Sequence, residues 1–120
     1  MGFKRKYTRF KVSSRFSRRL EKLIAGCAEV REMQNAGQII TAEKKYNKKL
    51  CFYYGECRFL LKRRAEELEG SENAVLEMEK IRAAFLEFYA LAEGYKVDIA
   101  EQKKDALAFI DKAEEVLRNK

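Results

Sequence analysis

The chain of 120 residues contains no proline, and this absence constrains its fold more than any other feature of the sequence. Proline interrupts an α-helix because it lacks the backbone N–H and clashes with the preceding turn. Ala, Leu, Glu, Lys and Arg, which all favour the helix, dominate the chain after its N-terminal residues. The sequence therefore predicts an all-α protein.

The first predicted helix begins at Ser13 or Ser14, either of which can cap a helix, and ends before Gly37, which can adopt the left-handed conformation of a helix terminus. Its apolar residues recur at alternating spacings of three and four, as expected for a helix that packs against near-antiparallel neighbours. These residues are Phe16, Leu20, Leu23, Cys27 and Val30.

The third and fourth predicted helices show the same period. Ser71 can cap the third and Gly94 can end it, while Asp98 and Glu101 resemble a capping box at the start of the fourth. The apolar residues of the third helix are Met78, Ile81, Phe85, Phe88 and Ala92, flanked by Val75, Leu86 and Tyr89. Those of the fourth are Ile99, Ala106, Ile110, Ala113 and Leu117, with Leu107, Phe109 and Val116 beside them.

The second predicted helix, residues 38–69, is the longest. Its apolar residues are Ile39, Tyr46, Leu50, Tyr53, Tyr54, Cys57, Leu60, Leu61 and Leu68. At 1.5 Å per residue it would extend about 45 Å, which is more than the first helix could cover. We therefore expect the second helix to protrude, to dimerise, or to break at Gly55.

Four amphipathic helices joined by short turns predict a four-helix up-down-up-down bundle. The bundle domain is expected over residues 14–120. Residues 1–13 show no clean helical stripe and are predicted to form a basic N-terminal arm that is flexible or extended. No internal repeat and no second domain are recognisable.

The charge of the chain is strongly asymmetric. Residues 1–19 hold eight basic and no acidic side chains, residues 20–64 hold ten basic and five acidic ones, and residues 65–120 hold eight basic and fourteen acidic ones. Such an asymmetric charge distribution is informative about binding partners rather than about the fold. It indicates that a polyanion binds the N-terminal half of the chain. Nucleic acid ranks first, an acidic protein second and an anionic membrane third.

Helical projection places a basic face on the second helix, opposite its apolar residues. Lys44 and Lys62, eighteen residues apart, would lie on one line, with Phe52 and Phe59 among the cations; Glu43 and Arg64 do not fit the scheme. The candidate nucleic-acid-binding residues of arm and helix are Lys4, Arg5, Lys6, Arg9, Lys11, Arg15, Arg18, Arg19, Lys44, Lys45, Lys48, Lys49, Lys62 and Arg63.

Each of these features has a plainer interpretation. Phe52 and Phe59 would stack on bases in one interpretation, and belong to the core or to a dimer interface in another. The lysines would equally suit an ordinary solvated face, and the arm a membrane surface or a solubilising tail.

Little in the sequence indicates catalysis. Histidine is absent, which removes the usual general base and the commonest metal ligand. Cys27 and Cys57 fit buried apolar positions, whereas Lys48 beside Cys51 could lower the pKa of that thiol. The cysteine spacings match no zinc site, and the carboxylates of the last two helices indicate a solvated acidic face. We expect no enzymatic activity, no cofactor and no metal.

The three cysteines without a disulfide pattern favour the cytoplasm or another reducing intracellular compartment. The sequence predicts a small nucleic-acid-binding or ribonucleoprotein accessory protein that contacts phosphates through its arm and the basic face of its second helix. The alternative is a non-enzymatic protein-interaction module, such as an adaptor, an assembly factor or an inhibitor, that binds a protein partner or a second copy. Membrane binding is the least favoured partner class.

Overall fold

The computed structural model describes the backbone of residues 2–119 and the side chains of residues 14–119. Helices connected by short turns account for nearly all of this part of the chain, and it contains no β-strand. The elements are α1 (Gly2–Asn35), α2 (Ile39–Lys45), the π-helical segment η1 (Tyr46–Leu50), α3 (Cys51–Leu68), α4 (Ala74–Glu93) and α5 (Ala100–Arg118). The prediction of an all-α fold is confirmed.

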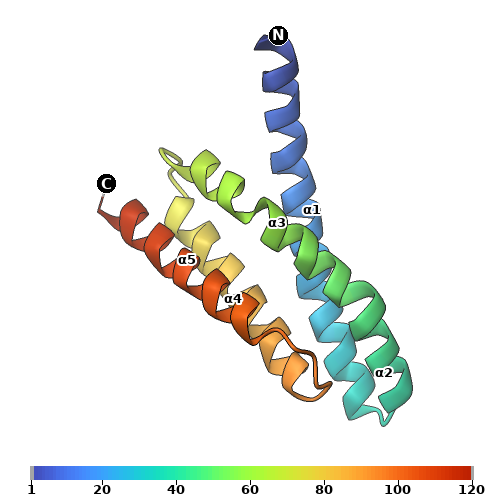
Figure 1. The fold of residues 1–120 in the computed structure, drawn as a ribbon. Coiled ribbons are helices and arrows are strands. Elements are labelled where there is room, and N and C mark those ends of the chain that lie inside the picture. Colours follow the sequence, from blue (N-terminus) through green and yellow to red (C-terminus); the bar gives the residue numbers. More distant parts are fainter. Residues whose placement is uncertain (1, 120) are drawn as a thin grey trace.

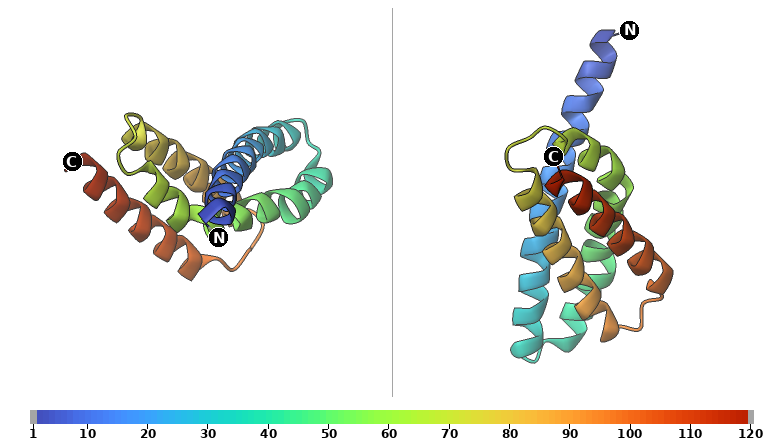
Figure 2. Two further views of the ribbon diagram at one scale, coloured as in Figure 1. Left: turned by 90° about the horizontal axis from the view of Figure 1, so that it is seen from above. Right: turned by 90° about the vertical axis from the view of Figure 1, so that its left-hand side faces the viewer.

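The helices form two hairpins (Figure 1). In the first, α1 packs along a long second rod that α2, η1 and α3 build without interruption. In the second, α4 packs against α5 and joins the hairpins through contacts with α1 and α3. The N-terminal turns of α1 extend beyond all the other helices (Figure 2). The molecule is therefore elongated, with extents of 50 × 31 × 24 Å.

Helix α1 begins at Gly2, well before the predicted start at Ser13 or Ser14. The backbone of residues 2–13, expected to be flexible or extended, continues the helix in this structure. A physical reason is available: no proline or glycine interrupts residues 3–25, and extending an existing helix avoids the cost of nucleating a new one. The side chains of residues 1–13 lie outside the described residues.

The core confirms most of the periodic positions. The five apolar residues predicted for the face of α1 and the five predicted for the face of α4 are all buried, as is Tyr89. On α5, Ala106 and Ile110 are buried, whereas Ile99, Ala113 and Leu117 pack against the core at its margin. Ile39, predicted on the apolar side of the second helix, is instead 58% exposed at the first position of α2.

The second predicted helix does not break at Gly55, but it is not one regular α-helix because it contains a π-helical segment. The buried residues Ala42, Tyr46, Leu50 and Tyr54 follow one another at spacings of four. In a regular α-helix each such step rotates the side chain by about 40°, so the run would turn away from α1. A wider turn, in which the N–H of Cys51 bonds to the carbonyl of Tyr46, holds the run on one side. The rod then continues as regular α-helix through Gly55 without a break.

The helix ends agree only partly with the predicted caps. Gly37 and Gly70 adopt left-handed conformations, with φ of 79° and 87°, and Gly94 caps α4. The capping box predicted from Asp98 and Glu101 is not formed, because α5 begins at Ala100 and its N-cap, Ile99, packs against the core. The N-cap of α4 is likewise Asn73 rather than Ser71.

Candidate nucleic-acid interface

The structure divides the fourteen basic candidates into groups with different surroundings. The side chains of Lys4, Arg5, Lys6, Arg9 and Lys11 lie outside the described residues. The other nine come from α1 and from the α2–η1–α3 rod, which pack side by side along the first hairpin.

Three of the nine are held by carboxylates at the junction of α1 and the rod. Arg15 donates to Glu56 at 2.7 Å, and Arg19 lies 3.4 Å from the same carboxylate. Lys45 is paired with Glu29 of α1. These contacts link α1 to the second rod. They also neutralise two acidic side chains that would otherwise repel a polyanion.

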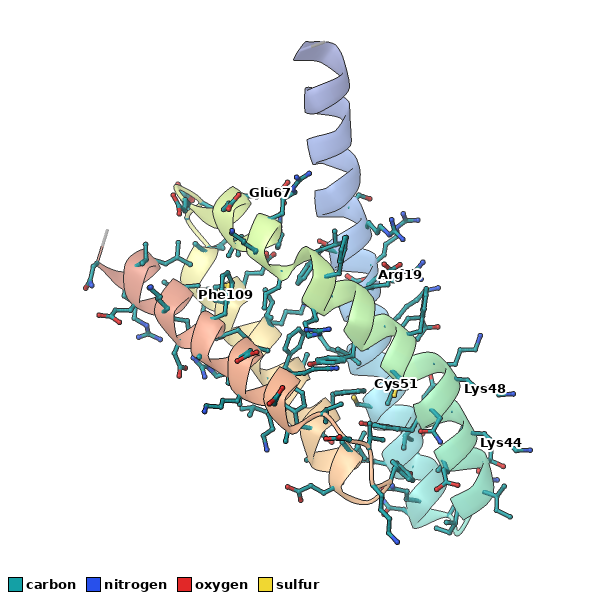
Figure 3. The ribbon with its side chains drawn as sticks, viewed as in Figure 1. Arg19, Lys44, Lys48, Cys51, Glu67 and Phe109 are labelled. Atoms are coloured by element: carbon teal, nitrogen blue, oxygen red, sulfur yellow. The ribbon has the colours of Figure 1, made fainter. Side chains whose placement is uncertain are left out.

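Six candidates remain exposed and form no ion pair with any side chain of residues 14–119. They are Arg18 on α1 and Lys44, Lys48, Lys49, Lys62 and Arg63 on the second rod. Figure 3 shows Lys44 and Lys48 extending outward from the edge of the molecule, away from the other helices. Their charges are available to a ligand.

The alignment of Lys44 with Lys62, assumed for an uninterrupted α-helix, does not hold. The π-helical segment lies between them and shifts the register of everything that follows it. Lys62 instead lines a groove between α3 and α5. It therefore belongs to a different surface from Lys44.

Phe52 and Phe59 are not part of the core. Their exposed fractions are 51% and 84%, and Phe59 is the most exposed large apolar side chain among the described residues. Phe52 is held in place, because the guanidinium of Arg19 lies 5.1 Å from its ring centroid and Tyr53 makes an edge contact at 5.9 Å. Phe59 forms no comparable ring contact.

Together these residues form a surface that we call the basic–aromatic strip. It runs along the outer side of the second rod and consists of Lys44, Lys48, Lys49, Phe52, Phe59 and Arg63. Arg19 and Lys22 of α1 adjoin it, since Lys22 Nζ lies 5.8 Å from the ring centroid of Tyr53. Lys22 was not among the candidates predicted from the sequence, although it lies three residues after Arg19 and therefore on the same side of α1.

Arg64, which did not fit the faces predicted for the second helix, is paired with carboxylates inside the protein. Its guanidinium binds Glu77 of α4 at 2.7–2.9 Å and also contacts Glu67, and this pairing outweighs desolvation and raises its pKa. Arg64 thus bridges α3 and α4 and takes no part in the strip.

The cysteines are poor nucleophiles. Burial raises the pKa of Cys27 and of Cys57 from 9.0 to about 12. Burial also raises the pKa of Cys51, which is opposite to the lowering expected from Lys48. All three are free thiols, and no cluster of metal-ligating side chains is found within the described part of the chain.

A second surface feature was not predicted. A groove of 220 Å³ lies between α3 and α5, with Ala65 on one wall and Phe109, Ala113, Val116 and Leu117 on the other. Residue periodicity does not reveal such a groove, because it depends on how far the two helices diverge. Lys62 and Lys112, together with Glu66 and Glu69, form its polar edges.

Comparison with known proteins does not assign the chain to a family: no family model, no curated protein and no solved structure matches it. Among the described residues, no helix has the length and apolar character needed to cross a membrane.

Proposed function

We propose that this protein binds nucleic acid through the basic–aromatic strip, with most contacts to the phosphate backbone. One observation carries the proposal: exposed cations without carboxylate partners lie on both sides of two exposed phenylalanine rings along a single rod. Lysine and arginine neutralise phosphates, and this term supplies most of sequence-independent affinity.

The charge distribution around the strip supports this proposal. Glu29 and Glu56, the carboxylates at the junction of the two rods, are each paired with a basic side chain. An approaching polyanion therefore meets uncompensated positive charge at Lys44, Lys48 and Lys49. Such a field accelerates association and favours binding with little base specificity.

Binding that depends on phosphates must weaken steeply with salt. If about five phosphates are neutralised, the slope of log K against log salt is about −4.5 for duplex DNA and about −3.5 for a single strand. Fluorescence anisotropy with labelled oligonucleotides at several salt concentrations measures this slope directly.

A pair of double variants tests the location. Lys48→Ala with Lys49→Ala removes two charges from the strip, whereas Lys80→Ala with Lys104→Ala removes two exposed charges from α4 and α5. We expect the first pair to weaken binding and to make the salt slope shallower by about 1.4 to 1.8, and the second to leave the slope unchanged. Equal effects of the two pairs, or no binding by the full chain at low salt, would contradict the proposal.

Deleting residues 1–13 tests the other predicted contact region. A further loss of affinity with a shallower slope would place part of the phosphate contact in these residues. Unchanged binding would restrict the site to the strip.

A second candidate function, a protein-interaction module, is favoured by the apolar groove between α3 and α5. An amphipathic helix of a partner could place its apolar side chains there. Sedimentation velocity of the wild-type chain and of Val116→Glu tests the case in which the partner is a second copy. A dimer that persists at moderate salt and dissociates in the variant would support this function, and a monomer at all concentrations would exclude self-association.

A further inference from the structure

The exposed rings make the proposed function more specific. On the premise that the strip binds nucleic acid, we propose that its ligand is a single-stranded polynucleotide whose unpaired bases stack on Phe52 and Phe59.

The two rings are placed to hold two bases of one strand. They are seven residues apart on the regular helix α3, so two turns bring them to the same side. The separation along the axis is about 10.5 Å. Two non-adjacent bases of one single strand can therefore stack on the two rings at the same time.

An undistorted duplex offers no base face to these rings. Its bases are stacked on one another, so their flat faces are covered and only their edges are accessible in the grooves. A single strand exposes base faces, and aromatic side chains on basic surfaces are the usual platforms for them. Phe59 offers an 84% exposed ring, and Phe52 is already oriented by Arg19 and Tyr53.

The cations flank the rings at both ends. Lys48 and Lys49 precede Phe52 by about one turn, and Arg63 follows Phe59 by about one turn. From Lys44 to Arg63 the strip is about 28 Å long, so one strand can contact the rings and the cations at both ends together. Single-strand-binding surfaces occupy about 4 to 16 nucleotides.

The experiment uses the full chain with labelled oligo(dT) and oligo(U) of increasing length, and with a duplex of mixed sequence. Affinity for the single strands is expected to rise with length and to level off between about 4 and 16 nucleotides. Phe59→Ala should weaken single-strand binding about tenfold, leave duplex binding unchanged and leave the salt slope unchanged because no charge is lost. Phe59→Trp should restore binding, since its indole is also a stacking platform.

Leu76→Ala is the matched control. Leu76 is 66% exposed on α4, so its truncation removes a comparable apolar side chain from another surface. Circular dichroism of both variants verifies that each is folded. Comparing the thymidine and uridine series separates DNA from RNA as the preferred strand.

The outcomes separate the two proposals. Tighter binding of single strands that falls in Phe59→Ala alone supports the inference. Equal binding of single strands and duplex, unaffected by Phe59→Ala, overturns the inference and leaves the strip as a phosphate-binding surface. Equal losses in Phe59→Ala and Leu76→Ala also overturn it. Absence of binding to every oligonucleotide overturns both proposals.

Discussion

The second rod carries aromatic rings on two sides with opposite surroundings. Toward α4, Tyr46 and Tyr54 are almost fully buried and stack on Phe88, with ring centroids 5.0 and 4.3 Å apart. On the outer side, Phe52 and Phe59 are mostly in solvent. The first set joins the two hairpins, whereas the second set contributes little to folding. We therefore predict that truncating an outer ring costs much less stability than truncating a ring of the buried set.

The largest effect is expected from Phe88→Ala, which removes the ring that both tyrosines contact. Phe88 is fully buried, so the variant leaves a cavity and should lose about 3 to 5 kcal/mol of unfolding free energy. Urea denaturation followed by circular dichroism measures the loss. A loss below about 1 kcal/mol would contradict the assignment of this cluster to the core.

Two glycines test the difference between the buried and the exposed sides of the helices. A Cβ on Gly26 would lie 2.7 Å from Cδ1 of the buried Leu50, whereas one on Gly55 would meet nothing within 4 Å. Gly26→Ala should therefore lose about 1 to 2 kcal/mol despite its better helix propensity. Gly55→Ala should gain up to about 1 kcal/mol. Changes of the same sign in chemical denaturation would argue against the close packing of α1 on η1.

A smaller loss of stability is expected when the paired hydroxyls of Tyr54 and Tyr89 are removed. The Tyr54 and Tyr89 hydroxyls lie 2.9 Å apart, and both residues are buried. Replacing either with Phe leaves the other hydroxyl without this partner and should cost about 1 to 2 kcal/mol. The double replacement should cost less than the sum of the single ones. Strict additivity in the double-mutant cycle would show that the two hydroxyls do not interact.

The pH dependence of stability reports on the buried thiols. Because burial raises the pKa of Cys57 from 9.0 to about 12, the folded state holds its proton more tightly than the unfolded state. The stability is complete below pH 9 and falls above it, by up to about 1.4 kcal/mol per pH unit for this one group. Unfolding midpoints measured from about pH 8 to 10 should fall less steeply in Cys57→Ala. An unchanged slope would mean that Cys57 is accessible in the folded state.

The smallest effect is expected on the outer side. Phe59→Ala should change the unfolding free energy by no more than about 0.5 kcal/mol, because the ring forms few contacts. Thermal and urea denaturation check this value. A loss comparable to that of Phe88→Ala would show that Phe59 is buried in solution, for example between two copies of the chain.

The sequence by itself determined the helical class, the turns at Gly37 and Gly70, and the core faces of α1 and α4. These properties are local, because a period of 3.6 residues and the conformational preferences of glycine act over a few neighbouring residues. The same local reasoning placed Phe52, Phe59 and the lysines outside the apolar arc of the second helix, but it could not decide between a second buried face and an exposed one.

The tertiary structure decided the rest. The π-helical segment keeps the buried residues that are spaced four apart on the inner side of the rod, toward α1 and α4, and it shifts Lys62 out of line with Lys44. Packing also directed Arg15, Arg19 and Lys45 to carboxylates of the neighbouring rod and opened the groove between α3 and α5. These outcomes depend on which surface meets which neighbour, and residue spacing along one helix carries no information about the distance to another.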